Sequence, residues 1–129
     1  MKLYLDADIF LAVLKENDRF KKAAVEFFGN REQYQFVTGS LTCLEVWFYL
    51  HRNGLGKNAL SSLRAIRAIA EILDYDSHDL EQAMILAETH NLTPADSIHA
   101  VLARVADAIV STDSSFDKTG IRRIDFSKI

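Results

Sequence analysis

The chain has 129 residues, of which 49% are hydrophobic and 26% are charged, a balance that is typical of a globular domain and excludes an intrinsically disordered chain. Its single cysteine, Cys43, excludes a disulfide framework and a cysteine-rich zinc site within one chain. The net charge of −3 includes no excess of basic residues, so charge alone does not mark the protein as a nucleic-acid binder.

Short β-like runs alternate with stretches of helical periodicity, a pattern typical of a parallel sheet flanked by helices. The expected strands cover residues 2–5, 35–37, 72–75, 108–110 and 123–126. The expected helices lie between them, at residues 9–14, 18–29, 42–53, 58–70, 77–90 and 93–105. No repeat or linker interrupts the alternation, so residues 1–129 are predicted to form a single α/β domain.

The start of the chain has no features of a signal peptide, because the apolar run Leu3-Tyr4-Leu5 is interrupted at once by Asp6 and Asp8. The longest apolar stretches are too short to cross a bilayer, so no membrane partner is expected. A single cysteine suits a reducing compartment. We therefore expect a cytoplasmic protein.

Acidic residues are predicted to follow the strands at one edge of the sheet. Asp6 and Asp8 come directly after the first strand, and Asp113 and Asp117 come directly after the fourth. Glu45 lies in the first turn of the helix that follows the second strand. Ligands of open parallel sheets bind outside the carboxyl ends of the strands, so these side chains are candidates for one common site.

Asp96 extends this set, because it lies in the first turn of the helix that precedes the fourth strand. Carboxylate oxygens suit a hard ion such as Mg²⁺ or Mn²⁺ better than they suit zinc. One or two such ions could orient an attacking water and stabilise a leaving oxygen on phosphate. The positive ends of the two helices would favour the ionised forms of Glu45 and Asp96.

These acidic residues also have structural interpretations. Thr42-Cys43-Leu44-Glu45 has the form of a helix capping box, and Thr93-Pro94-Ala95-Asp96 is similar, with proline in the first turn. Asp113 could cap a short helix, and Asp117 could be a solvated turn residue. Asp6 differs from these, since a carboxylate at the end of a buried strand is costly without a partner.

Histidine and aromatic residues are assigned to helix faces, the surface or the core. The four histidines show no paired metal-ligand spacing and are expected on the surface or on helix faces: His51, His78, His90 and His99. Trp47, Phe48 and Tyr49 are expected in the core or on a dimer surface rather than in base stacking. The absence of a glycine-rich phosphate loop in the sequence excludes P-loop and dinucleotide-binding sites.

Four segments, taken together and in this order, resemble the PIN-domain family, and within it the VapC-type toxins of prokaryotic toxin–antitoxin pairs. Leu3-Tyr4-Leu5-Asp6-Ala7-Asp8 resembles the opening strand and first acidic ligand, and Ser40-Leu41-Thr42-Cys43-Leu44-Glu45 resembles the serine-then-glutamate segment. Ala95-Asp96-Ser97-Ile98-His99-Ala100 is similar to the third acidic segment. Ser111-Thr112-Asp113-Ser114-Ser115-Phe116-Asp117 is similar to the fourth, so the resemblance covers nearly the whole chain.

The resemblance implies four ligands for Mg²⁺ or Mn²⁺, which are Asp6, Glu45, Asp96 and Asp113. Ser40 and Thr112 would orient these ligands through hydrogen bonds, and Asp117 would be an additional or outer acid. Position 8 departs from the pattern of many relatives, which carry Asn, Ser or Thr there. Asp8 would therefore add a negative charge beside the site.

The resemblance also implies a three-layer α/β/α fold with a parallel sheet of about five strands, commonly found as a homodimer. It implies endonucleolytic cleavage of RNA by metal-activated water. The usual partner would be an antitoxin protein that blocks the site.

Two other functions compete with the nuclease. A phosphoacceptor receiver domain would use Asp6, Asp8 and Asp76, but it leaves Glu45 without a role and needs a lysine after the fifth strand that is not convincingly placed. A PIN fold kept only for contacts with RNA or protein, without catalysis, is the second alternative. Acids at all four ligand positions argue against such a loss of activity.

Overall fold

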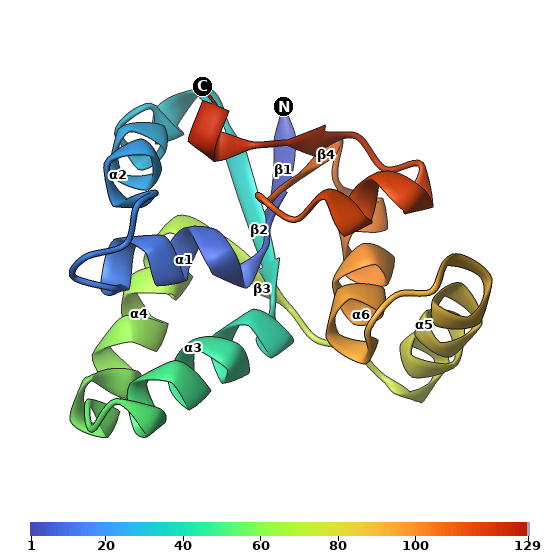
Figure 1. Cartoon of the computed structure of the whole chain (residues 1–129), viewed down its shortest axis with the longest axis horizontal. Helices are drawn as coiled ribbons and strands as arrows, with labels where there is room; N and C mark the ends of the chain where they lie inside the picture. The colour runs from blue at the N-terminus through green and yellow to red at the C-terminus, as the bar shows by residue number, and fades with distance from the viewer. Residues whose placement is uncertain (129) are drawn as a thin grey trace.

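The computed structural model describes residues 1–128 and contains one sheet of five parallel strands (Figure 1). Ile129, the last residue of the predicted domain, lies outside the described residues. The strands are β1 Lys2–Leu5, β2 Gln35–Gly39, β3 Ala70–Leu73, β4 Ala108–Val110 and β5 Arg123–Ile124. Their order is β3-β2-β1-β4-β5. The order reverses at β1, and ligands of such sheets bind at this switch point.

Helices cover both faces of the sheet, as the predicted three-layer α/β/α fold requires (Figure 1). One face carries four helices, which are α1 Ala7–Leu14, α2 Lys21–Gly29, α3 Ser40–Arg52 and α4 Ala59–Ile69. The other face carries α6 Pro94–Leu102, against which α5 Ser77–His90 packs. Short 3₁₀ segments occupy the connections: η1 Arg31–Gln33, η2 Gly56–Asn58, η3 Ala103–Val105, η4 Ser114–Thr119 and η5 Phe126–Lys128.

Alternation of side chains along β1 determines which layer each residue joins. Leu3 and Leu5 belong to the hydrophobic cluster on the face of α1 to α4, whereas Tyr4 belongs to the cluster on the face of α6. Burial on both faces explains the continuous apolar sequence of this central strand. The strand ends at Leu5 because Asp6 is the N-cap of α1, where its Oδ1 accepts a hydrogen bond of 2.7 Å from the Ala7 amide.

The strand order excludes the receiver-domain interpretation. That fold places its third strand beside the first, in the order 2-1-3-4-5. Here β3 pairs with β2, in a register that sets Phe36 opposite Ala70, and β1 pairs with β4 instead. The predicted α/β class and parallel sheet of about five strands are confirmed.

Several predicted element boundaries are wrong. The helix expected from residue 42 begins at Ser40 with Gly39 as its N-cap, so Thr42 is a buried residue inside α3 and forms no capping box. The helix expected from residue 18 begins at Lys21, because the Asp18 carboxylate accepts a hydrogen bond from the Phe20 amide and closes a turn before it. The helix expected at residues 77–90 has these bounds, and Asp76 forms its capping box with Asp79.

The strand expected at residues 72–75 covers Ala70–Leu73 instead. Of the two positions predicted for Trp47 and Phe48, the core or a dimer surface, the structure excludes the core. Trp47 is 57% exposed and Phe48 is 53% exposed, although their neighbour Tyr49 packs against the core. Across residues 1–128, no helix combines the length and the apolar character that a membrane span requires.

Candidate active site

Asp6 lies at the carboxyl end of β1, beside the end of β4. Its backbone amide donates a hydrogen bond of 3.1 Å to the Val110 carbonyl and continues the β1–β4 pairing by one residue. Its Oδ2 accepts a hydrogen bond of 2.8 Å from the Ser111 hydroxyl. The residue is only 7% exposed. Both of its carboxylate oxygens are oriented at the switch point of the sheet, one by the Ala7 amide and the other by the Ser111 hydroxyl.

Asp8 lies two residues further along, in the first turn of α1, and faces the same strand end. Its Oδ2 accepts hydrogen bonds of 2.7 Å from both the amide and the hydroxyl of Thr112, and one of 3.3 Å from the Ser111 hydroxyl. Its Oδ1 is buried and has no hydrogen-bond partner within residues 1–128. The extra acid at position 8 therefore contributes an unpaired, buried oxygen.

Glu45 approaches the same region from α3 through His99, a residue of α6 (residues 94–102). Nε2 of His99 lies 2.5 Å from Glu45 Oε1 and 3.5 Å from Asp6 Oδ1. His99 is only 1% exposed, so its expected position on a surface or an open helix face is wrong. Burial lowers the pKa of His99, but the hydrogen bond with Glu45 and the charge of Asp6 outweigh it, and the net shift is upward.

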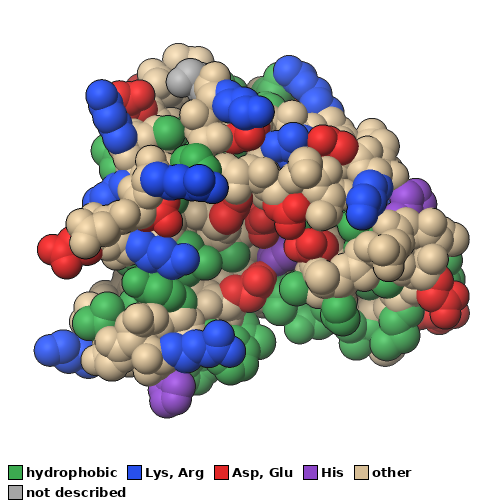
Figure 2. Space-filling view, viewed as in Figure 1, with side chains coloured by type: hydrophobic (Ala, Val, Ile, Leu, Met, Phe, Trp, Pro, Cys, Tyr) green, Lys and Arg blue, Asp and Glu red, His purple; other side chains and the backbone are tan. Residues whose placement is uncertain are grey.

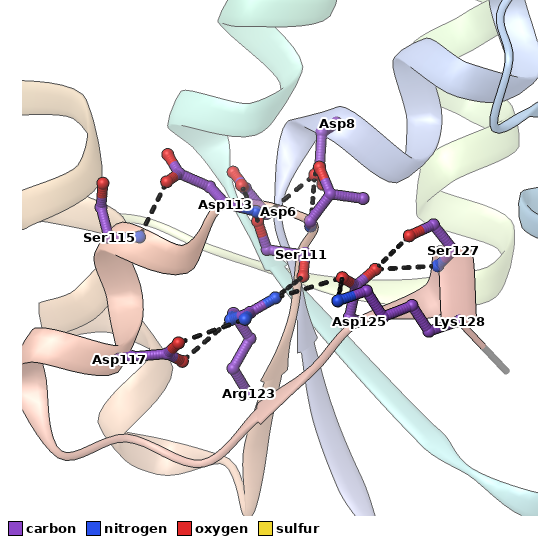
Figure 3. A network of polar contacts seen from close by, with 11 residues as sticks. Asp6, Asp8, Ser111, Asp113, Ser115, Asp117, Arg123, Asp125, Ser127 and Lys128 are labelled. Atoms are coloured by element: carbon purple, nitrogen blue, oxygen red, sulfur yellow. Dashed lines mark hydrogen bonds and ion pairs between the residues drawn. The ribbon is translucent and has the colours of Figure 1, made fainter.

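Asp96 and Asp113 form the third part of the cluster. The Thr93 hydroxyl accepts a hydrogen bond of 3.2 Å from the Asp96 amide, which confirms Thr93 as the cap of α6. Asp113 caps η4 by accepting a hydrogen bond of 2.9 Å from the Ser115 amide (Figure 3), and its own amide donates one of 3.0 Å to the Ser111 hydroxyl. Asp113 thus combines a capping role with a position close enough to Asp96 for its charge to raise the pKa of that residue.

Asp117 lies outside this cluster and pairs with Arg123 of β5 (Figure 3). The guanidinium holds both carboxylate oxygens at 2.9 and 3.1 Å and donates a further hydrogen bond of 3.2 Å to the Ser111 carbonyl. Within residues 1–128, Asp117 is therefore connected to the cluster only through Arg123 and Ser111. Ser40, the first residue of α3, has no side-chain hydrogen bond within the part of the chain that the structure describes.

The cluster carries more negative charge than its surroundings compensate. Burial raises the pKa of Asp6 to about 7, with the charge of Asp8 adding to the rise and that of His99 opposing it. Burial likewise raises the pKa of Asp8. The pKa of Asp96 is raised by burial and by the charge of Asp113.

The acidic side chains meet in the middle of one face of the molecule (Figure 2). Within residues 1–128, none of the five carboxylates of the cluster forms an ion pair with lysine or arginine; the five are Asp6, Asp8, Glu45, Asp96 and Asp113. Histidine 99 is their one ion-pairing partner among these described residues. The cluster therefore has an uncompensated charge.

A hard divalent cation fits this donor set. All five side chains offer oxygen, one of these oxygens is buried without a partner, and three of the carboxyl groups have a raised pKa, which a nearby cation would lower. Within the described residues, no three His, Cys, Asp or Glu side chains yet stand in the arrangement of a complete metal site.

The model of the PIN domain family matches residues 3–122, which is most of the chain and includes every residue of the cluster. The chain is a PIN domain. None of the curated proteins compared with it matches.

Solved structures share the fold of this PIN domain at low sequence identity. VapC20 of Mycobacterium tuberculosis, described as a toxin that cleaves the sarcin–ricin loop, has a TM-score of 0.79 and 17% identity over 92% of this chain and 95% of its own. DNA-bound VapBC of Salmonella typhimurium has a TM-score of 0.70 and 20% identity over 98% of each chain. A toxin–antitoxin complex of Klebsiella pneumoniae has a TM-score of 0.70 and 15% identity over 96% of this chain and 97% of the other.

Sequence reasoning missed two residues that organise this PIN domain's acidic cluster. His99 lies three residues after Asp96 on α6, a spacing that places both on one face of a helix and could have revealed it. Ser111 directly follows the buried strand β4, so its hydroxyl lies beside the residue that follows β1. Ser111 could have been recognised by its position at the end of a strand rather than by its residue type.

Proposed function

We propose that this PIN domain is a Mg²⁺- or Mn²⁺-dependent endoribonuclease and the toxin of a toxin–antitoxin pair. The observation that carries the proposal is the cluster of five carboxylates without a lysine or arginine partner at the switch point of the sheet, within residues 1–128. A fold shared with VapC20, a toxin that cleaves the sarcin–ricin loop, supports RNA as the substrate.

Four carboxylates would hold the ion, and they are Asp6, Glu45, Asp96 and Asp113. When bound, the ion would supply an activated water and charge stabilisation for the leaving oxygen of a phosphodiester. Ser111 keeps Asp6 oriented by its hydrogen bond of 2.8 Å, and Thr112 does the same for Asp8 with two hydrogen bonds of 2.7 Å. Asp8 therefore adds charge next to the ligands while remaining attached to the strand end.

Basic side chains lie on the same face of the molecule as the acidic centre, mostly above it and to its left in Figure 2. Lysine and arginine bind phosphates without regard to base sequence, so this arrangement suits a strand of RNA whose backbone crosses the cluster. Acidic residues gathered at one centre, with basic side chains elsewhere on the same face, are also consistent with RNA binding by a protein whose net charge is −3.

An antitoxin and a second copy of the chain are the proposed partners in the cytoplasm. VapBC of Salmonella typhimurium and the Klebsiella pneumoniae complex are toxin–antitoxin assemblies, which supports such a partner here. Exposed apolar side chains offer surfaces for protein contacts on α3 and on α5, and they include Trp47, Phe48, Met84 and Ile85.

Incubation of the purified protein with a panel of structured and single-stranded RNAs, in Mg²⁺ or Mn²⁺, tests the proposal. We expect cleavage that stops in EDTA and in the Asp96→Asn variant. Calorimetric titration with Mn²⁺ accompanies the assay. A folded protein that neither binds Mn²⁺ nor cuts any RNA would instead favour a PIN fold that only binds RNA or protein.

A further inference from the structure

A line of polar contacts runs from the neighbourhood of the β2–α3 junction to the acidic cluster. It joins the Tyr4 hydroxyl, which lies beside Gly39, to the His99 ring, and the ring to the Glu45 carboxylate. We propose that Tyr4 and His99 are positioning residues, in which Tyr4 holds the His99 ring so that its Nε2–H points at Glu45 and Asp6. The purpose of this arrangement rests on the proposed function, since it orients two of the carboxylates assigned to the metal.

His99 lies at the centre of the line. Its Nδ1 is 2.8 Å from the Tyr4 hydroxyl, and its Nε2 is 2.5 Å from Glu45 Oε1 and 3.5 Å from Asp6 Oδ1. A carboxylate only accepts hydrogen bonds, so Nε2 carries a proton whether the ring is neutral or charged. In the neutral ring Nδ1 is then the acceptor, and the Tyr4 O–H is the donor that selects this tautomer.

Tyr4 is suited to this role because its hydroxyl is held in place at His99. Its side chain is completely buried, and the hydroxyl lies 2.8 Å from His99 Nδ1. The ring meets the imidazole edge to face, with centroids 5.8 Å apart and an interplanar angle of 63°. The hydroxyl thus fixes one nitrogen of His99, and the aromatic contact fixes the plane of its ring.

Gly39 provides independent support, because it makes room for the hydroxyl. A Cβ at this position would lie 2.6 Å from the Tyr4 hydroxyl oxygen and 2.9 Å from Cδ1 of Leu102, both too close for a side chain. The backbone of Gly39 has φ −98°, which any residue adopts. Glycine is therefore needed here for space rather than for conformation, and the space is occupied by the tyrosine hydroxyl.

The line of polar contacts ends at Glu45 and Asp6, two of the proposed metal ligands. Burial of a hydroxyl and an imidazole is costly unless both are hydrogen-bonded, and an apolar pair would fill the same volume without that cost. Outer partners that orient metal ligands typically raise metal affinity by about 10- to 100-fold. The expected benefit is therefore metal affinity, obtained by restricting how Glu45 rotates.

Tyr4→Phe tests the proposal, because it removes the hydroxyl and keeps the ring. Tyr34→Phe is the matched control, since Tyr34 precedes the opposite end of β2. We expect Tyr4→Phe to weaken Mn²⁺ binding about threefold to tenfold, because it removes one hydrogen bond. Calorimetry without RNA measures this affinity. In long-range ¹H–¹⁵N spectra at a pH where the ring is neutral, the wild type should show the proton on Nε2 alone.

The same spectra should show a mixture of tautomers for His99 in Tyr4→Phe, and again in Gly39→Ala, whose Cβ would displace the hydroxyl. His99→Gln should retain more Mn²⁺ affinity than His99→Leu, because its amide can still donate to Glu45. Equal Mn²⁺ affinity in Tyr4→Phe and Tyr34→Phe, with an unchanged His99 spectrum, would overturn the positioning role.

The two proposals fail in different ways. Mn²⁺ binding by the wild type without cleavage of any RNA would count against the nuclease, while the effect of Tyr4→Phe on Mn²⁺ affinity and on the His99 tautomer would still decide the positioning role. Metal-dependent cleavage together with an unchanged His99 spectrum in Tyr4→Phe would keep the nuclease and remove the positioning role.

Discussion

Two acidic regions lie next to each other at the ends of β1, β4 and β5, and they differ in how their charge is balanced. In the cluster around Asp6 the carboxyl groups are buried or half-buried, and the pKa of Asp6 rises to about 7. Around Arg123, the guanidinium holds Asp117 with two hydrogen bonds of 2.9 and 3.1 Å and lies 3.5 Å from Asp125. The pKa of Asp117 is lowered by this contact.

The difference teaches which acids are available for function. Aspartates that have an arginine partner are already neutralised. That partner, Arg123, also connects β5 to the end of β4 by donating a hydrogen bond to the Ser111 carbonyl (Figure 3). The cluster around Asp6 is oriented instead by hydroxyl and amide donors, which fix geometry without neutralising charge. An unbalanced charge that is geometrically fixed is what a site for a divalent cation requires.

The largest expected effect comes from removing one charge of the cluster. Asp6→Asn should lower RNA cleavage by at least about 100-fold, more than the loss of an outer partner usually costs. The fold should be retained or stabilised, because burial of the ionised carboxylate is no longer required. Cleavage assays and urea unfolding check both parts. A folded Asp6→Asn protein with full activity would refute the role of Asp6.

The pH dependence of stability should have opposite signs in the two regions. The folded-state pKa of Asp6 lies above its unfolded value of 3.8, so the metal-free protein should lose stability as pH rises from about 4 to about 7, by on the order of a few kcal/mol. The lowered pKa of Asp125 contributes stability that is lost as pH falls below about 4. Urea unfolding at several pH values measures both trends. Asp6→Asn should weaken the first, and the raised pKa values of Asp8 and Asp96 should leave the remainder.

Removal of the Arg123 guanidinium should affect the stability of the protein more than its cleavage of RNA. Arg123→Met should lower the free energy of unfolding by about 1–3 kcal/mol, since it removes hydrogen bonds to Asp117 and to the Ser111 carbonyl. Arg122→Met is the control, because the side chain of Arg122 is exposed. If Arg123→Met instead lowered Mn²⁺ affinity as strongly as Asp6→Asn, the separation of the two regions would be wrong.

The smallest effect is expected for Asp117→Asn. Asp117 is exposed and reaches the cluster only through Arg123 and Ser111, so Mn²⁺ affinity and cleavage should stay within about twofold of the wild type. Calorimetry and a cleavage assay beside Asp113→Asn give the comparison. A large loss in Asp117→Asn would place this residue among the metal ligands.

The sequence predicted the fold class and the region of the site because both depend on local patterns. Burial on both faces makes a central strand such as β1 continuously apolar, and an acid that follows such a strand must lie at the carboxyl edge of the sheet. Segments with weaker local signals were placed less well. Thr42 had the spacing of a capping box. However, the N-cap of α3 is Gly39, because the helix begins at Ser40, directly after β2 and without a loop.

Gly39 and His99 show where local patterns end. Nothing near Gly39 in sequence explains its lack of a side chain; the reason is the hydroxyl of Tyr4, which comes from a different strand. His99 has no metal-ligand spacing to any other histidine, and its partners Tyr4 and Glu45 are 95 and 54 residues away. Contacts over such distances depend on the packing of α6 and α3 around the strand ends.

By itself the sequence determined an α/β PIN domain with acids at the carboxyl ends of its strands, because hydrophobic alternation and strand-end position are properties of neighbouring residues. The tertiary structure alone decided which acids share a charge and which have a partner. Arg123 neutralises Asp117, while Asp6 and Asp8 remain without lysine or arginine in residues 1–128. Electrostatic balance depends on distance and burial in space, and neither can be obtained from spacing along the chain.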